Sequence, residues 1–411
     1  MAFPPAKKPV SLLGFHRILS PTAGVRVSPL CLGAMNFGEA WKAFLGECSK
    51  ETAFDMLNYF YEQGGNFIDT ANNYQNEESE TWIGEWMQTR NNRDEMVIAT
   101  KFTLVVHPFQ PLCELKTDFR GSTGFRAAST HEKLRTNFQG NHTKSLRVSL
   151  EHSLKKLQTS YIDLLYVHWW DFTTSVPELM NSLHHLVASG KVLYLGISDT
   201  PAWQVVKCNE YARQHGLTQF CVYQGNWSAA LRDFEREIIP MCAAEGMALA
   251  PWGALGRGQF KTAEEYNAED REGRKTGAQN PHYERIAAKL NELAEKKGTL
   301  RTSIALAYVM HKAPYVFPIV GGRKVEHLKG NIEALSIELT QQEIDEIDDA
   351  EPFDIGFPLS FLYGFGGQAY RTHMTAQDLG LIAANGYIET HPKQAVIAPG
   401  TGAKRHGLDG Q

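Results

Sequence analysis

Residues 66–102, NFIDTANNYQNEESETWIGEWMQTRNNRDEMVIATKF, contain two short apolar runs separated by a helical pattern. The first run ends on the carboxylate Asp69, the second ends on Lys101, and Tyr74 lies in the turn-rich segment between them. Short apolar runs of this kind are typical of parallel strands that are buried on both faces. Because neighbouring parallel strands end at the same edge of a sheet, the sequence predicts that an acid, a phenol and an amine meet there.

A phenol beside an ammonium group can serve as a proton donor. The reference pKa of tyrosine is about 10, which is too high for efficient donation near neutral pH. A nearby ammonium stabilises the phenolate and lowers that pKa, and Asp69 would hold the ammonium of Lys101 in place. We therefore predict that Tyr74 is a general acid tuned by Lys101 and Asp69.

Eight apolar runs alternate with helical patterns along the chain. They are residues 30–35, 66–70, 96–100, 162–167, 192–197, 220–223, 247–250 and 316–320. Eight parallel strands, each followed by a helix, predict an α/β fold of the (β/α)8 TIM-barrel class. A doubly wound sheet would normally carry GxGxxG after an early strand, and the sequence has none. Residues 15–27, with Gly24 between two β-like pieces, predict a hairpin before the barrel.

The pattern also suggests the bounds of the domain. We expect residues 1–14 to be a flexible leader and residues 15–351 to form the barrel. Residues 352–411 would form an extension that partly folds over the barrel mouth and ends in disorder. The connections at 103–142 and 253–282 are long and follow carboxyl ends of strands, so we expect them to be lids over a pocket.

Composition narrows the classes of partner. The chain has 411 residues, 43% of them hydrophobic, and a formal net charge of −5, which gives no reason to expect nucleic-acid binding. No segment has the length of a signal peptide core or a membrane span. The six cysteines form no CxxC pair and predict reduced thiols. We expect a cytoplasmic protein that binds no metal and is a monomer or a weak homo-oligomer.

Side chains suited to a site stand at the carboxyl ends of seven predicted strands. They are Asp69, Lys101, His168, Ser198-Asp199, Gln224, Trp252 and Gly321-Gly322-Arg323-Lys324. Capping, core packing or solvation could explain any one of them, but together they predict one site across the barrel mouth. Arg323 and Lys324 would open the last barrel helix, and a helix N-terminus is a good place to bind phosphate.

These motifs resemble those of the aldo-keto reductase superfamily, over about residues 13–350. The residues that carry the resemblance are Asp69-Thr-Ala-Asn-Asn-Tyr74, Ala99-Thr-Lys101-Phe, Asp163-Leu-Leu-Tyr-Val-His168, Gly190-Lys-Val-Leu-Tyr-Leu-Gly-Ile-Ser198 and Pro318-Ile-Val-Gly-Gly-Arg-Lys-Val-Glu-His-Leu-Lys-Gly-Asn331. Within that superfamily the chain is most similar to the branch of fungal aryl-alcohol dehydrogenases and norsolorinic acid reductases.

The resemblance implies a role for each motif. Tyr74 would be the general acid, with Lys101 and Asp69 tuning it, and His168 would orient the substrate carbonyl. Other residues would bind NADPH: the carboxamide at Ser198, Asp199 and Gln224, the ring on Trp252, the pyrophosphate within residues 253–258, the 2′-phosphate at Arg323 and Lys324, and the adenine end near His327 and Asn331. The complete implied set of cofactor contacts is Gly33, Ala34, Met35, Asp69, Ser198, Asp199, Gln224, Trp252, Gly253, Ala254, Leu255, Gly256, Gly258, Gly321, Gly322, Arg323, Lys324, His327 and Asn331.

Two departures from the family pattern concern the nicotinamide and the substrate. Many relatives have Asn where this chain has Asp199, and a carboxylate accepts hydrogen bonds but cannot donate one to the carboxamide oxygen. Met35 and Phe37 stand where many relatives place a large aromatic residue near the substrate. We expect the pocket walls to include Met35, Phe37, Phe102 and Trp169.

The resemblance implies NADPH-dependent reduction of an aryl or polyketide-type aldehyde or ketone to the alcohol, in secondary metabolism. The alternative is a barrel that binds NADPH for regulation without turnover, similar to the potassium-channel β subunits. A short-chain dehydrogenase would need a Tyr-x-x-x-Lys helix and a glycine-rich first turn, and the sequence has neither.

Overall fold

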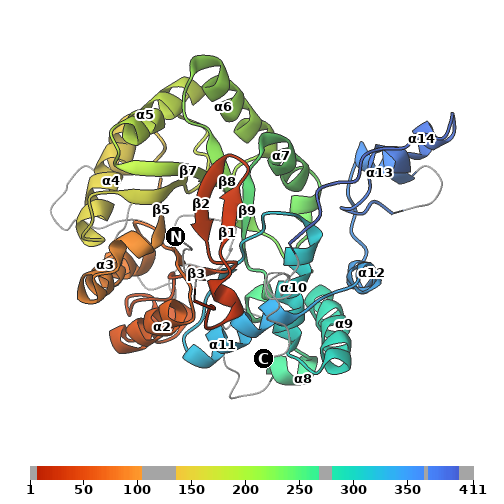
Figure 1. Cartoon of the computed structure of the whole chain (residues 1–411), viewed down its shortest axis with the longest axis horizontal. Coiled ribbons are helices and arrows are strands. Elements are labelled where there is room, and N and C mark those ends of the chain that lie inside the picture. Colours follow the sequence, from red (N-terminus) through yellow and green to blue (C-terminus); the bar gives the residue numbers. More distant parts are fainter. Residues whose placement is uncertain (1–6, 104–135, 268–279, 365–368, 398–411) are drawn as a thin grey trace, which may run out of the picture.

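Eight parallel strands form the centre of the molecule in a computed structural model that describes residues 7–103, 136–267, 280–364 and 369–397 (Figure 1). The strands are β3 (Cys31–Gly33), β4 (Phe67–Asp69), β5 (Val97–Phe102), β6 (Ile162–Val167), β7 (Val192–Ser198), β8 (Phe220–Asn226), β9 (Ala248–Trp252) and β10 (Ile319–Val320). They lie in the order β10-β3-β4-β5-β6-β7-β8-β9. A bridge between Leu249 and Val316 brings the last strand segment against β9, so the predicted (β/α)8 barrel is confirmed.

Helices surround the strands. The longer ones are α2 (Lys50–Glu62), α3 (Glu78–Arg90), α4 (Thr143–Lys156), α5 (Val176–Ala188), α6 (Ala202–His215), α7 (Ile238–Glu245), α9 (Pro281–Lys297), α10 (Arg301–Lys312), α11 (Val325–Glu333) and α12 (Gln341–Asp349). The shorter ones are α1 (Lys42–Leu45), α8 (Ala263–Asn267), α13 (Leu359–Gly364) and α14 (Gly380–Ala383). N-cap side chains define where several helices begin. The hydroxyls of Ser49 and Ser175 accept hydrogen bonds from backbone N–H groups in the first turns of α2 and α5. Of the described helices, none has the length and apolar character needed to cross a bilayer.

A hairpin closes the amino-terminal end of the barrel. Its strands are β1 (Arg17–Ser20) and β2 (Ala23–Val27), which pair antiparallel as predicted. The turn falls at residues 21–22, and Gly24 lies inside β2 rather than between the two strands. The hydroxyl of Thr22 donates to the carbonyl of Gly246, just before β9, at 2.9 Å. The hairpin therefore covers the end of the barrel opposite the predicted site.

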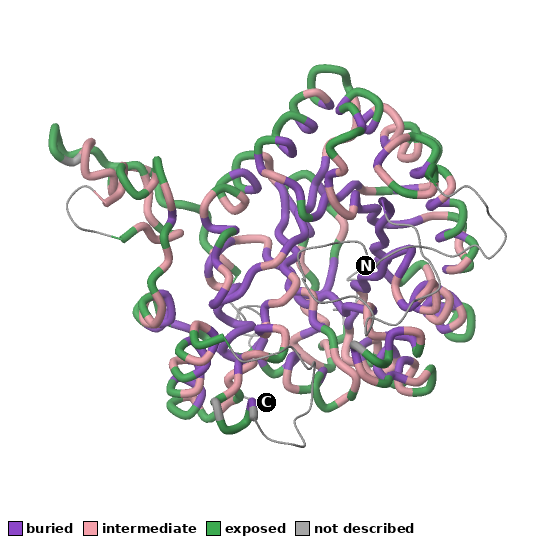
Figure 2. Tube along the Cα trace, turned by 180° about the vertical axis from the view of Figure 1, so that it is seen from behind, coloured by how far each residue is buried: buried purple, intermediate pink, exposed green. Residues whose placement is uncertain are grey.

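The core has two parts. One cluster packs the outer faces of the strands against the helices, and the other fills the barrel interior beneath the hairpin with residues such as Leu19, Phe67 and Phe317. Figure 2 shows the buried strands enclosed by helices whose outer faces are exposed.

Leu13 is fully buried in the first cluster, so packed structure begins before the predicted boundary at residue 15. The described cysteines are buried and free: Cys31, Cys48, Cys208, Cys221 and Cys242.

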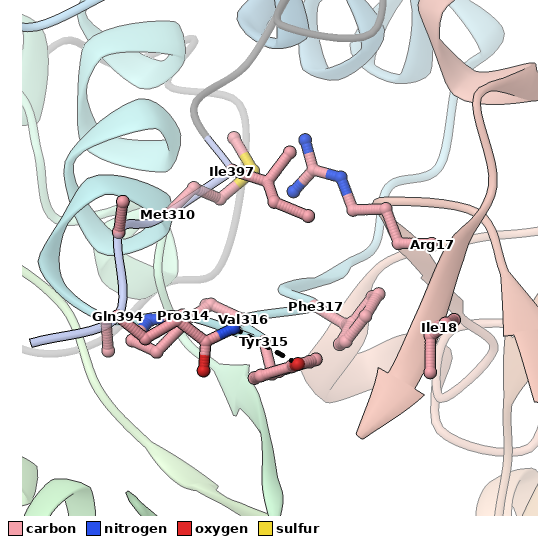
Figure 3. Close-up of a pocket in the computed structure, with 11 residues that line it drawn as sticks. Arg17, Ile18, Met310, Pro314, Tyr315, Val316, Phe317, Gln394 and Ile397 are labelled. Carbon is pink, nitrogen blue, oxygen red and sulfur yellow. Dashed lines mark hydrogen bonds between the residues drawn. The ribbon is translucent and has the colours of Figure 1, made fainter. Parts of the chain in front are cut away.

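The described part of the extension follows the side and the amino-terminal face of the barrel. Phe353 lies beneath the guanidinium groups of Arg232 and Arg236, and Arg371 pairs with Asp349 of α12 at 2.5 Å. The amide of Gln394 donates to the Tyr315 hydroxyl at 3.2 Å, beside the small pocket of Figure 3. The Gln394 contact lies at the hairpin end of the barrel, opposite the mouth over which we expected the extension to fold.

The two predicted lids fall largely outside the described residues. The connection at 103–142 includes residues 104–135, and the connection at 253–282 includes residues 268–279, none of which is described. The described part of the second connection begins with the glycine turn after β9.

Candidate active site

The predicted acid and amine meet where β4 and β5 end. The ammonium of Lys101 donates to Asp69 Oδ1 at 2.5 Å and to the carbonyl of Thr70 at 2.7 Å. Lys101 is 0% exposed and Asp69 is 3% exposed, so this is a buried ion pair. Asp69 Oδ2 accepts from the amide of Gln224 at the end of β8, at 2.9 Å. Both carboxylate oxygens are therefore hydrogen-bonded, as a buried charge requires.

Tyr74 and His168 complete the group of four predicted catalytic side chains. The Lys101 ammonium lies 5.0 Å from the centre of the Tyr74 ring. The His168 ring stands nearly perpendicular to the Tyr74 ring, with 6.0 Å between their centres. Both residues are partly exposed, whereas the Asp69–Lys101 pair beneath them is buried. The structure thus brings together the four residues that the sequence singled out.

The electrostatics of Tyr74 differ from the prediction in net direction. Burial raises the pKa of the Tyr74 phenol and outweighs Lys101, which lowers it; the charge of Asp69 raises it further. The prediction of a pKa below 10 is therefore wrong, although the effect of Lys101 has the expected sign. Burial also acts to lower the pKa of Lys101, but Asp69 and Tyr74 raise it above its usual value. Near neutral pH the phenol is protonated and the amine is charged.

His168 is held as a neutral imidazole. Burial, together with the charge of Lys101, brings the pKa of His168 well below its usual value. Its backbone N–H donates to the carbonyl of Phe102 at 3.0 Å, which fixes the residue at the end of β6. Its buried Nδ1 has no hydrogen-bond partner within the described chain. A neutral ring carries one donor and one acceptor, and so can orient a polar ligand without a charge.

A second polar group lies at the ends of β7, β8 and β9. The backbone N–H of Asp199, which has a left-handed φ of 42°, donates to the carbonyl of Gln224 at 3.1 Å. Desolvation raises the pKa of the Asp199 carboxyl to about 6, against the lowering effects of Ser198 and Trp252, although the residue is exposed. Ser198 lies near that carboxylate, yet its buried Oγ makes no hydrogen bond of good geometry to any described residue.

A glycine-rich backbone turn follows β9 at the mouth. Gly253, Gly256 and Gly258 follow β9 with left-handed φ values of 77°, 69° and 82°, conformations in which a side chain would be strained. Arg257, between the last two, lies 5.6 Å from the ring of Trp252. A side chain on Gly253 would also meet the carboxamide oxygen of Asn226 at 2.6 Å. The turn therefore brings bare backbone close to the ends of β8 and β9.

The predicted phosphate-binding residues open α11. Lys324 is the N-cap of that helix, and Arg323 precedes it. Arg323 lies against the loop after β3, since a side chain on Gly46 would meet its Nη1. The carbonyl of Gly322 accepts from the amide of Asn36 at 3.3 Å. Of the two residues expected near the adenine, His327 is exposed and Asn331 is buried.

The residues predicted to line the substrate pocket separate into two pairs. Met35 and Trp169 are partly exposed, whereas Phe37 and Phe102 are fully buried in the core cluster. The role of all four residues as pocket walls stays a prediction. Sequence reasoning missed Trp41, whose ring stands edge-on to Tyr74 with 6.3 Å between centres. Its position in the loop after the first strand was the only signal that could have indicated it.

The family model for the aldo/keto reductase family matches residues 29–352. Norsolorinic acid reductase A of Aspergillus parasiticus is 60% identical over 407 residues, covering 99% of each chain. Norsolorinic acid reductase B of Dothistroma septosporum is 58% identical over 353 residues, 85% of this chain and 84% of the relative. An aryl-alcohol dehydrogenase of Pestalotiopsis microspora is 50% identical over 407 residues, 96% of each chain.

Proposed function

The chain belongs to the aldo/keto reductase family, in the branch of norsolorinic acid reductases and fungal aryl-alcohol dehydrogenases, and from this premise we propose that it reduces an aryl or polyketide-type aldehyde or ketone to the alcohol with NADPH. The observation that carries the proposal is the buried Asp69–Lys101 pair, whose ammonium lies 5.0 Å from the centre of the Tyr74 ring, with the His168 ring beside it. These are the groups that the protonation of a carbonyl oxygen needs.

The residues around the mouth fit a nicotinamide dinucleotide. Three buried polar atoms there have no partner within the described chain: Asn36 Oδ1, Ser198 Oγ and Asn226 Oδ1. Buried polar atoms are normally paired, so these suit a polar ligand. Ser198, Asp199 and Gln224 would hold the carboxamide, residues 253–258 the pyrophosphate, and Arg323 with Lys324 the 2′-phosphate. When bound, NADPH supplies the hydride.

The protein supplies the proton and the orientation. The phenol of Tyr74 donates its proton to the carbonyl oxygen as that oxygen becomes negative. Lys101 stabilises the resulting phenolate, and Asp69 keeps the ammonium charged and in place. His168, being neutral, donates a hydrogen bond to the same oxygen and fixes its direction. Water then returns a proton to Tyr74.

The substrate class rests on the relatives and on the aromatic surroundings of Tyr74. The relatives are named for norsolorinic acid and for aryl alcohols. Trp41 and His168 present ring edges to Tyr74, and Trp169 is partly exposed beside His168. Aromatic walls favour a flat aromatic carbonyl over a sugar. The alternative of an NADPH-binding regulatory barrel is disfavoured because a binding module has no need of the intact proton-donating group.

A spectroscopic assay tests this function. The full chain is mixed with NADPH and a panel of aryl aldehydes and polycyclic ketones, and absorbance is followed at the reduced nicotinamide band. Tyr74→Phe should lower turnover by about 10²–10⁴-fold and still bind NADPH. Tyr61→Phe, a tyrosine of α2 that bonds Glu95, is the matched control and should be unchanged. Near-parental turnover in Tyr74→Phe would overturn the acid role; NADPH binding without oxidation by any carbonyl would favour the regulatory barrel.

A further inference from the structure

The turn that carries Tyr74 has an unusual backbone. The three residues after Tyr74, namely Gln75, Asn76 and Glu77, have left-handed φ values of 52°, 51° and 81°. None of them is glycine, and side chains rarely adopt this conformation. Strained residues of this kind persist only where the surrounding structure holds them. The position of the phenol therefore depends on whatever contacts fix this turn.

Lys156 holds the turn from one side. It is the last residue of α4, and its side chain is 12% exposed. Its ammonium donates to the carbonyl of Asn72 at 2.9 Å and to Glu77 Oε1 at 3.2 Å, and it lies 2.9 Å from Glu80 Oε2. An ammonium has three N–H donors, and three oxygens surround this one. Asn72 and Glu77 flank Tyr74, so a single charge spans the segment that contains the phenol.

The same contacts reach the strand that carries Lys101. Glu80, at 0% exposure, accepts from the hydroxyl of Thr100 at 2.6 Å, and Thr100 immediately precedes Lys101 in β5. The backbone N–H of Asn72 donates to the carbonyl of Lys101 at 3.1 Å. Two routes thus link the Lys156 ammonium to Lys101. One runs through the Glu80 carboxylate to Thr100, and the other runs through the backbone of Asn72.

The backbone of Lys156 is itself fixed against helix α3. A side chain on Gly84 would meet the carbonyl oxygen of Lys156 at 2.2 Å, so the two helices approach closely only because Gly84 has none. Trp41 braces the opposite side of the turn: its backbone N–H donates to Gln75 Oε1 at 2.7 Å, and its indole N–H donates to Asn76 Oδ1 at 3.2 Å. The turn is therefore clamped between α4 and the loop after β3.

We propose that Lys156 is a positioning residue for the proposed reaction: through Asn72, Glu77 and Glu80 it holds the left-handed turn that keeps the Tyr74 hydroxyl in register with Lys101. The inference rests on the proposed role of Tyr74 as proton donor. Lys156 lies on a helix behind the site, and its proposed function does not require contact with substrate or cofactor. Glu80 and Glu77 raise the pKa of Lys156 against the effect of burial, so the clamp stays charged.

The test compares Lys156→Met with a lysine of the same structural type. Lys312 is also the last residue of its helix, α10, and its ammonium lies 2.7 Å from Asp348 Oδ2 and 3.1 Å from Glu235 Oε2, far along the chain from Tyr74. Both substitutions remove an ammonium from a buried carboxylate, Glu80 or Asp348, and both should lower the unfolding midpoint in urea. Only Lys156→Met should lower kcat, by up to about 10²-fold, with the affinity for NADPH retained.

Two further measurements separate positioning from general damage. A displaced Tyr74 loses part of its contact with Lys101, so the pH above which reduction slows should move upward in Lys156→Met and stay in place in Lys312→Met. Lys156→Arg keeps a charge able to meet both carboxylates and should restore kcat. If Lys156→Met does not fold, Lys156→Met combined with Glu80→Gln and Glu77→Gln removes the unpaired charges and should still show the kcat loss.

The outcomes also distinguish this inference from the proposed function. If the parent oxidises NADPH with a carbonyl substrate and Tyr74→Phe does not, the proposed function is supported. A folded Lys156 variant with parental kcat and an unmoved pH profile then overturns the positioning role alone. If the parent oxidises no NADPH with any carbonyl, the proposed function itself fails. Equal losses of kcat in Lys156→Met and Lys312→Met would show that Lys156 only stabilises the fold.

Discussion

Removing the ammonium of Lys101 should impair catalysis by an amount that can be worked from its distance to the phenol. At the 5.0 Å that separates this ammonium from the centre of the Tyr74 ring, a unit charge contributes about 3 kcal/mol at an effective dielectric constant of about 20. That energy stabilises the phenolate and corresponds to roughly 10²-fold in rate. Lys101→Met should therefore lower the rate of carbonyl reduction by roughly this factor.

The same substitution should destabilise the fold for a separate reason. Without Lys101 the carboxylate of Asp69 keeps only the amide of Gln224, and the carbonyl of Thr70 loses its donor. Breaking a buried ion pair by removing one partner costs about 3–5 kcal/mol. The double variant Asp69→Asn with Lys101→Met removes the unpaired charge, so it should recover most of the stability and none of the rate.

Single-turnover NADPH oxidation measures the rate, because it isolates chemistry from product release, and urea unfolding measures the stability. Reduction needs a protonated Tyr74, so the rate falls as the pH rises through the pKa of that phenol. Loss of Lys101 raises this pKa further, so in Lys101→Met the decrease in the reduction rate should occur at a higher pH. The reasoning is refuted if folded Lys101→Met keeps the parental single-turnover rate, or if the double variant regains the rate together with the stability.

Three other predictions concern the cofactor and the fold. Desolvation raises the pKa of Asp199 to about 6, and only the protonated acid can donate to the carboxamide oxygen. The affinity for NADPH should therefore increase as the pH falls through that value in the parent and stay flat in Asp199→Asn; parallel fluorescence titrations in the two proteins would contradict this. Arg323→Ala should weaken NADPH binding by about 10- to 100-fold, as the loss of a charge-assisted hydrogen bond does, and leave NADH binding unchanged. Lys329→Ala, an exposed lysine of the same helix, is the control, and equal losses toward both cofactors in Arg323→Ala would refute the 2′-phosphate role. Leu13→Ala should lower the free energy of unfolding in urea by about 2–5 kcal/mol, because the side chain is fully buried. An unchanged free energy of unfolding would instead support a flexible leader over residues 1–14.

The barrel could be predicted because its strands carry a local signal. All six residues of β5 and of β6 are buried, and such runs indicate strands without knowledge of their neighbours. The fold then supplies the rest, since parallel strands must end together. Asp69, Lys101 and Gln224 are far apart in sequence, yet their hydrogen bonds follow from standing at strand ends.

Features that depend on long-range packing could not be predicted in this way. The Thr70 carbonyl that accepts from Lys101 has no signature in the sequence, and Trp41 acquires its place beside Tyr74 only through the left-handed turn. The hairpin turn was misplaced at Gly24 because glycine usually marks a turn, whereas residues 21–22 make it. The path of residues 352–397 depends on ion pairs such as Arg371–Asp349, whose partners the sequence does not reveal.

The net pKa of Tyr74 shows why knowing the neighbours of a residue is not enough. The sequence supplied Lys101 and Asp69 but not the desolvation, which raises the pKa by more than Lys101 lowers it. That desolvation serves a proton donor, because the phenol must keep its proton until a carbonyl oxygen demands it. It also makes Lys101 more effective, since a charge acts more strongly where water is excluded. Burial that raises the pKa at rest thus increases the stabilisation available once the proton leaves, provided that Asp69 keeps Lys101 charged.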